Sequence, residues 1–99
     1  MENIIRDQEW VWVIIERHTT DEQLLGQFDQ ERRESFIPVF RNKDDGFMCL
    51  GRMVKKPDHN YQLQAMRFGD VAKAARENLF MIFILGGGGE IQDRISLSQ

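Results

Sequence analysis

Residues 80–98 read FMIFILGGGGEIQDRISLS, and this stretch constrains how the rest of the chain can fold. Its apolar residues, rich in aromatic and β-branched types, predict a buried strand over residues 80–85. The glycines at 86–89 are typical of a tight reversal of the chain. Residues 90–98 then return as the partner strand, so we expect a β-hairpin over this stretch.

Two more apolar runs and one alternating run predict further strands. Residues 10–15 read WVWVII, and residues 35–40 read SFIPVF. Because Pro38 lacks the N–H that strand pairing needs, we expect its strand to be paired incompletely on one side. Residues 61–66 alternate between two kinds of side chain, which predicts a peripheral strand with one wetter face.

Two segments have the pattern of helices. Asn42 is a good N-cap for a first helix, which Pro57 would end. Its buried stripe would be formed by Phe47, Leu50 and Val54. The second helix is expected over residues 68–78, ending with Asn78 in the left-handed conformation. Its stripe would be formed by Phe68, Val71, Ala75 and Leu79.

Residues 23–28 fit two structures. A capping box would start a helix here, because Thr20 is followed three residues later by Gln23. Apolar residues at alternate positions, with a glycine between them, fit instead a short strand that forms a hairpin with residues 10–15. The pattern alone leaves both structures open.

The order of these elements predicts an α+β fold in a single domain over residues 1–99. Residues 1–8 would be an N-terminal extension and residues 95–99 a possible tail. We expect one mixed, largely antiparallel sheet of about five to six strands with two helices packed on one face.

The three apolar runs are apolar at nearly every position, and this pattern has a consequence for the sheet. Strands that meet helices on one face and water on the other alternate between apolar and polar residues. Two helices on one face would leave a second apolar face, which we expect a second copy of the chain or a protein partner to cover. The alternative is that residues 1–7 fold over it. The predicted interaction surface is formed by Trp10, Trp12, Phe36, Phe40 and Phe83.

Composition excludes several classes of function. The 99 residues carry a net charge of −3, which gives no positive field for nucleic acid. The apolar runs are too short to cross a membrane, which takes roughly 20 residues. The one cysteine, Cys49, cannot form an internal disulfide, and residues 1–9 lack the apolar core of a signal peptide. We therefore expect a cytoplasmic protein.

Candidate chemical groups are few, and none forms a recognisable site. His18 lies near Glu16 and Asp21, but no second histidine stands at the spacing of metal ligands. Cys49 falls inside the first predicted helix, where a packing role fits better than a nucleophile. The glycines at 86–89 are not followed by the lysine of a phosphate loop, so they fit a hairpin turn. We expect neither catalysis nor a metal or cofactor.

Several features match a known family in their order. They are residues 36–40 before a capped helix, residues 69–75 in the second helix, and residues 81–85 running into glycine. Over residues 10–90 this order resembles the domain of the bacterial enhanced-serine-sensitivity protein family. The resemblance implies a small mixed sheet with helices on one side and no established catalytic residues. It also favours a strand over residues 23–28.

The sequence departs from that family at one point. The family commonly has an asparagine and a proline before the closing glycine, where this chain has Leu85 and further glycines. We expect a noncatalytic protein-interaction module that self-associates through the apolar sheet face. The alternative is a small-ligand-binding or sensor domain with a pocket on the aromatic sheet face.

Overall fold

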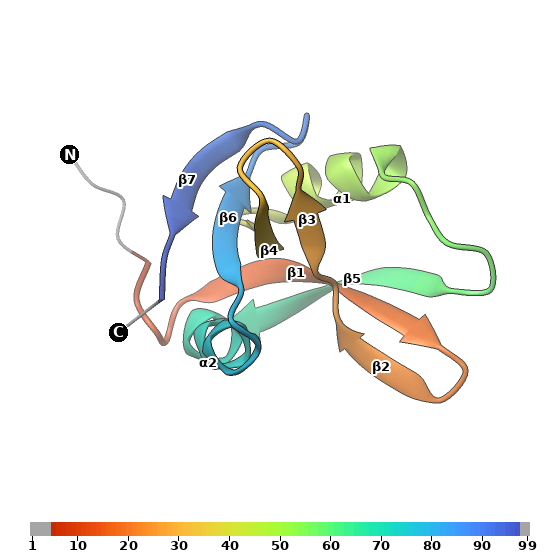
Figure 1. Ribbon diagram of the computed structural model, residues 1–99, viewed down its shortest axis with the longest axis horizontal. Helices are drawn as coiled ribbons and strands as arrows, with labels where there is room; N and C mark the ends of the chain where they lie inside the picture. The colour runs from red at the N-terminus through yellow and green to blue at the C-terminus, as the bar shows by residue number, and fades with distance from the viewer. Residues whose placement is uncertain (1–4, 98–99) are drawn as a thin grey trace.

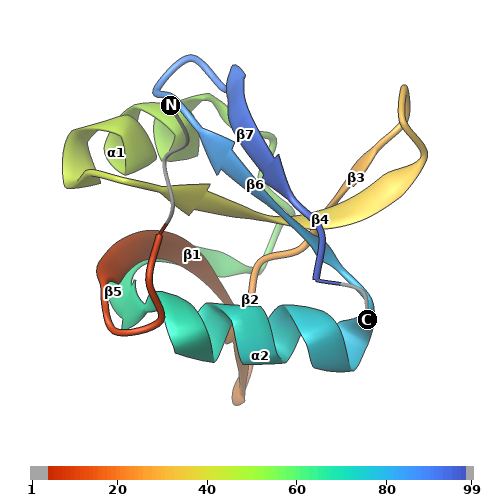
Figure 2. The same cartoon turned by 90° about the vertical axis from the view of Figure 1, so that its left-hand side faces the viewer.

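The computed structural model describes residues 5–97, which form a strongly bent sheet with one helix on each face (Figures 1 and 2). This part of the chain contains seven strands and two helices. The elements in chain order are β1 (Trp10–His18), β2 (Asp21–Leu24), β3 (Gln27–Asp29), β4 (Glu34–Phe40), α1 (Lys43–Arg52), β5 (Asn60–Arg67), α2 (Phe68–Asn78), β6 (Met81–Leu85) and β7 (Ile91–Ile95).

The sheet is mixed and largely antiparallel, as predicted, with more strands than expected. One edge of β1 pairs antiparallel with β5 over residues 10–17. The other edge pairs antiparallel first with β4, at residues 12–13, and then with β2, at residues 15–18. β6 pairs parallel with β4 and antiparallel with β7. The predicted hairpin over residues 80–98 is therefore present as β6 and β7.

The segment that the sequence left open, residues 23–28, is part of two short strands. β2 pairs with β1, and β3 pairs with β4, so the chain changes partner at Leu25 and Gly26. A Cβ on Gly26 would lie 2.5 Å from a ring carbon of Phe80, so only glycine allows this close approach. On β4, Pro38 falls between the part that pairs with β3 and the part that pairs with β1. The predicted incomplete pairing at this proline is confirmed.

The two helices lie on opposite faces of the sheet, so the expectation that both pack on one face is wrong (Figure 2). Successive residues of a strand point to opposite faces, and each face has its own apolar set and its own helix. The face covered by α2, here called the α2 side, buries Val11, Val13, Ile15, Ile37, Val39, Phe68, Val71, Ala72, Ala75, Ile82 and Ile84. The face covered by α1, the α1 side, buries Ile14, Leu25, Phe36, Phe40, Phe83 and Leu85.

α1 begins where the sequence predicts and ends earlier. The Asn42 side chain accepts a hydrogen bond from the Asp45 N–H at 2.9 Å, which confirms the N-cap. The helix ends at Arg52, because Met53 is already extended, well before Pro57. The residues after Met53 therefore form a loop that leads into β5.

The predicted buried stripe of α1 is wrong, because the helix is rotated relative to it. Phe47 is 53% exposed and Val54 is 95% exposed. Gly46 faces the sheet instead, where a Cβ would lie only 2.6 Å from Cδ1 of Leu63. The partly buried residues that follow it on this face are Cys49, Leu50 and Met53. The small Gly46 therefore sets the contact face, since it lets the helix approach β5 closely.

α2 occupies the predicted residues but ends differently. Phe68, Val71 and Ala75 are buried as expected, whereas Leu79 is 91% exposed. Leu79, rather than Asn78, takes the left-handed conformation, with φ of 60°. This conformation lets two N–H groups cap the end of the helix. The Leu79 N–H donates to the Arg76 carbonyl and the Phe80 N–H to the Ala75 carbonyl.

The described ends of the chain pack on the α2 side. Ile5 and Leu97 are partly buried against its core, and the Asp7 carbonyl accepts a hydrogen bond from the Gly69 N–H at 2.8 Å. The alternative that residues 1–7 cover the aromatic face is therefore wrong for residues 5–7, which lie on the other side. Residues 1–4 lie outside the described part of the chain, as do residues 98–99 of the possible tail. Neither α1 nor α2 is long and apolar enough to span a membrane.

Candidate functional site

The five residues predicted as an interaction surface do not form one. Phe36, Phe40 and Phe83 are buried in the α1 side, and Trp12 is partly buried beside them. Trp10 alone of the five is largely exposed, at 58%. The aromatic face needed a cover, as the sequence indicated, and α1 together with the bend of the sheet provides it.

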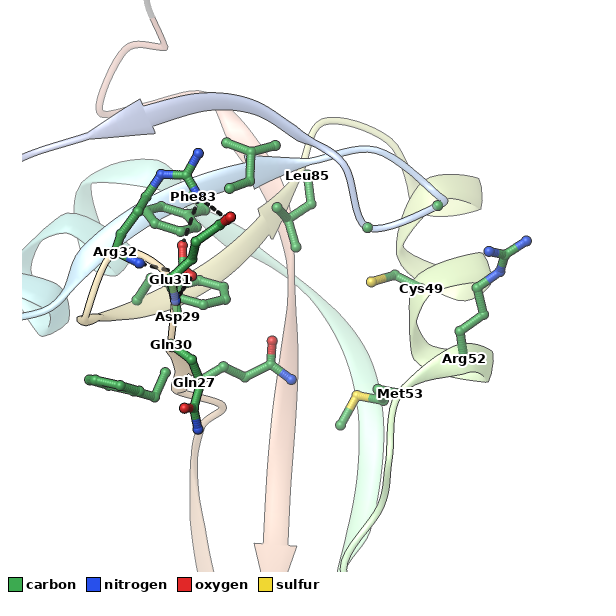
Figure 3. A pocket seen from close by; sticks show the side chains of 15 residues that line it. Gln27, Asp29, Gln30, Glu31, Arg32, Cys49, Arg52, Met53, Phe83 and Leu85 are labelled. Atoms are coloured by element: carbon green, nitrogen blue, oxygen red, sulfur yellow. Dashed lines mark hydrogen bonds and ion pairs between the residues drawn. The ribbon is translucent and has the colours of Figure 1, made fainter.

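A cleft remains on the α1 side, between α1 and the β3–β4 hairpin (Figure 3). Its volume is about 480 Å³. The floor is formed by Phe36 and Phe83, whose rings stack with centroids 4.2 Å apart and planes 12° apart. Cys49 and Met53 line the α1 wall, and Gln27 lines the β3 wall. The sheet, the helix and the hairpin thus each contribute one side of this cavity.

The position of α1 explains why the cleft stays open. The helix approaches the sheet closely at Gly46, above Leu63 of β5. It also lies close to the β6–β7 turn, where a Cβ on Gly87 would lie 2.7 Å from Sδ of Met48. The side chains between these contacts, including Cys49, are only partly buried. α1 therefore leaves the cleft open on the hairpin side, where it touches Phe36 and Phe83, although these two side chains are only 8% and 1% exposed.

The hairpin wall of the cleft is held by Asp29. Its Oδ1 accepts hydrogen bonds from the N–H groups of Glu31 at 3.0 Å and Arg32 at 3.3 Å, and its Oδ2 pairs with Nη1 of Arg32 at 3.0 Å. Desolvation alone would raise the pKa of Asp29, but the hydrogen bonds from Arg32 and Glu31 outweigh it and lower that pKa. The Asp29 carbonyl also accepts from the Arg33 N–H at 2.7 Å. The loop is thus ordered by its own side chains.

The formal charges around the cleft balance, because two acidic and two basic residues line it: Asp29, Glu31, Arg32 and Arg52. Burial raises the pKa of the Cys49 thiol. The charge of Arg52 lowers this pKa and that of Glu90 raises it, both by less than burial does, so the thiol is protonated at neutral pH. Arg52 is directed away from the cavity, whereas the Cys49 sulfur and the Gln27 side chain point toward it (Figure 3). Within residues 5–97 the Gln27 side-chain amide has no hydrogen-bond partner. An unpaired amide therefore faces a mainly apolar cavity.

The glycine turn between β6 and β7 closes one end of the cleft. The Gly86 N–H donates to the Glu90 carbonyl and the Gly89 N–H to the Gly86 carbonyl, both at 2.9 Å. The Gly88 N–H donates to the Glu90 carboxylate at 3.1 Å. Because these amides are used within the turn, the hairpin explanation of the glycines is confirmed.

A polar cluster lies at the carboxyl end of β1, and the sequence analysis did not predict it. Oε2 of Glu16 accepts a hydrogen bond from the Tyr61 hydroxyl at 3.0 Å and lies 2.9 Å from Nδ1 of His59. The His18 ring stacks on His59 with centroids 4.2 Å apart. The sequence placed His18 near Glu16, but His59 arrives only through the pairing of β1 with β5.

Glu16 is only 7% exposed, and its neighbours keep it ionised. Burial raises its pKa, but hydrogen bonds from Tyr61, Gln23 and His59, together with the charge of Lys56, outweigh burial and lower the pKa. The Lys56 N–H donates to the Tyr61 hydroxyl at 3.0 Å, so the cluster ties the loop after α1 to β1. In the part of the chain that the structure describes, no group of three or more histidine, cysteine or acidic residues is arranged to hold a metal ion.

Comparisons with known proteins do not assign the chain to a family. No family model matches the sequence, and searches of curated proteins and of solved structures give no match. The resemblance to the enhanced-serine-sensitivity family stays a prediction. One of its implications, helices on a single side of the sheet, is corrected by the opposite faces that α1 and α2 cover.

Proposed function

We propose that the protein is a noncatalytic domain that binds a small, largely apolar ligand in the cleft between α1 and the β3–β4 hairpin. One observation carries the proposal: a cavity of about 480 Å³ lies between α1 and the hairpin, and its lining includes the stacked Phe36 and Phe83. Ligand sites are typically concave, mostly apolar and supplied with a few polar groups, within roughly 300–1,000 Å³.

The structure of the hairpin supports ligand binding. Loops that must become ordered on binding reduce affinity, because their conformational entropy is lost. Here Asp29 already holds the loop through hydrogen bonds from Glu31 and Arg32. The wall of the cleft therefore exists before a ligand arrives.

Self-association through the aromatic face has less support than ligand binding. That idea depended on a face without a cover, and α1 covers it. Three of its five residues, Phe36, Phe40 and Phe83, are buried within the chain. Self-association stays a prediction, and it would have to use other side chains together with Trp10.

The single cysteine of the chain allows a direct test of the proposal. Cys49 lines the cleft, so a bound ligand will shield its thiol from a chromogenic disulfide reagent. We expect compounds from a fragment library that raise the Tm also to slow the labelling of Cys49. Labelling followed by absorbance, with and without each compound, measures this protection.

A matched control moves the thiol out of the cleft. The variant Cys49→Ser with Gly51→Cys places a cysteine on α1 where a Cβ meets no atom within 4 Å. Ligands should leave the labelling rate of this control unchanged. The proposal fails if no binding compound protects Cys49, or if compounds protect both positions equally.

A further inference from the structure

If the cleft binds a small ligand as proposed above, the side chains around it also indicate the class of ligand. We infer that the ligand is an uncharged, planar heteroaromatic ring that carries a hydrogen-bond donor next to an acceptor, as a free nucleobase does. Charge, shape and hydrogen bonding each contribute one part of this assignment.

The charges around the cleft argue against an ionic ligand. Arg32 pairs with Asp29 at 3.0 Å and lies 3.7 Å from a Glu31 oxygen, so its charge is already compensated. Arg52 points away from the cavity (Figure 3), and the Cys49 thiol is neutral. A charged group inside the cleft would lose its hydration without gaining an opposite charge. The interior therefore suits an uncharged molecule.

The two walls favour a flat aromatic ring over an aliphatic chain. Phe36 and Phe83 stack on each other at the floor, where Phe36 is 8% and Phe83 1% exposed, so a ligand would meet mainly the Phe36 ring. Aromatic rings pack well in offset or edge-to-face arrangements. The α1 wall presents the sulfur atoms of Cys49 and Met53, which make favourable contacts with aromatic rings. A planar ring between the walls would contact Phe36 on one side and sulfur on the other.

Gln27 adds the hydrogen-bonding requirement. Its side-chain amide points toward the cavity (Figure 3), is partly buried, and is unpaired among the described residues. An amide offers an acceptor oxygen and a donor NH₂ side by side, which matches a ring edge that has a donor next to an acceptor. Glutamine makes this paired contact with adenine in nucleic-acid recognition. The amide would thus select such rings from other flat molecules.

Adenine is the probe for this inference, with indole as a planar ring that lacks the paired edge. We expect adenine to bind in isothermal titration calorimetry at pH 7 and to protect Cys49 from the disulfide reagent. The variant Gln27→Met keeps the length of the side chain and removes the amide. It should weaken adenine about tenfold, the value of one to two neutral hydrogen bonds, and leave indole within about twofold.

Two controls separate recognition from damage to the fold. Gln64→Met changes an exposed glutamine of β5 outside the cleft and should leave both affinities unchanged. Benzoate, a planar anion, should bind more weakly than adenine. The Tm of each variant, measured without ligand, shows whether the protein remains folded.

The outcomes distinguish this inference from the proposed function. If indole or cyclohexanol protects Cys49 while adenine does not, the inference is overturned and the ligand-binding function stands. The inference is also overturned if folded Gln27→Met binds adenine as the unmodified protein does, or if benzoate binds more tightly than adenine. If neither these probes nor the fragment library protects Cys49, the proposed function fails as well.

Discussion

The two sides of the sheet are apolar to a similar degree, yet they are covered in different ways. On the α2 side the helix buries four side chains, those of Phe68, Val71, Ala72 and Ala75. On the α1 side the only fully buried residue of the helix is Gly46, which has no side chain to contribute. The α2 side consequently has the larger buried core, with cavities of about 180 and 340 Å³ at its margin, whereas on the α1 side a cleft of about 480 Å³ reaches the core residues themselves. An apolar strand pattern therefore predicts that a face will be covered, but the helix decides how completely.

Replacing one apolar side chain on each side by alanine should change the free energy of unfolding most, and by unequal amounts. Ile84 is fully buried on the α2 side, so Ile84→Ala should lower the free energy of unfolding by about 2–5 kcal/mol, because it removes packed atoms and leaves a cavity. Met53 borders the open cleft, so Met53→Ala should cost about 1 kcal/mol or less. Urea denaturation at pH 7 measures both values.

Equal costs for these two substitutions would contradict the comparison. They would show that the α1 side is packed as tightly as the α2 side in solution. The unfolding slope with urea should stay the same in both variants, since neither change alters the surface exposed on unfolding to a measurable extent.

The stability of the protein should also depend on pH through Glu16, the one buried charged residue that the structure describes. Its folded pKa lies below the ordinary value of 4.5, so the carboxylate adds stability that is fully present above pH 4.5. This contribution is lost as pH falls through the lowered folded pKa. Glu16→Gln should cost about 1–3 kcal/mol at pH 7, because Tyr61 and His59 lose a charged acceptor.

The stability of the Glu16→Gln variant should fall less steeply below pH 4.5 than that of the unmodified protein. Glu22→Gln is the control, since Glu22 is exposed and forms an ion pair with Arg17, which is exposed as well. It should change stability by less than about 1 kcal/mol. Parallel pH profiles for the unmodified protein and Glu16→Gln would show that Glu16 does not carry this dependence.

The smallest effects should come from the two glycines of α1, and they should have opposite signs. At Gly51 a Cβ meets nothing within 4 Å, so Gly51→Ala should stabilise the protein by about 0.5–1 kcal/mol through helix propensity. At Gly46 a Cβ would lie 2.6 Å from Leu63, so Gly46→Ala should destabilise it by about 1 kcal/mol. Thermal unfolding of the pair measures both, and stabilisation by Gly46→Ala would mean that α1 does not rest closely on β5.

Local rules predicted most elements and their ends. The apolar runs at 10–15, 35–40 and 80–85 became β1, β4 and β6, and the N-cap at Asn42 and the glycine turn at 86–89 were found from residue type alone. These features succeed because each depends on neighbours along the chain. The predicted buried stripe of α1 was wrong because hydrophobicity alone ranks Phe47 above Gly46 as the residue that contacts the sheet. In the structure the small Gly46 makes this contact, since only a residue without a side chain fits there.

The candidate sites were less accessible to sequence reasoning. The sequence analysis offered a pocket on the aromatic face as an alternative, on the pattern of residues such as Phe36 and Phe83. It did not predict that Gln27 would line such a pocket. Nor did the contact between Glu16 and His59, which are 43 residues apart. These groups meet through strand register and through the change of pairing partner at Leu25 and Gly26, which no local pattern specifies.

By itself, the sequence determined that the chain forms strands that are apolar on both faces, two helices and a closing hairpin, because periodicity and capping act over a few residues. Only the tertiary structure decided that the helices cover opposite faces and that the cleft lined by Phe36 and Phe83 lies on the α1 side. The reason is steric. How closely a helix can approach a sheet depends on the side chains of both, and here Gly46 lets α1 rest closely on Leu63, while Cys49 and Met53 face the cleft above Phe36 and Phe83.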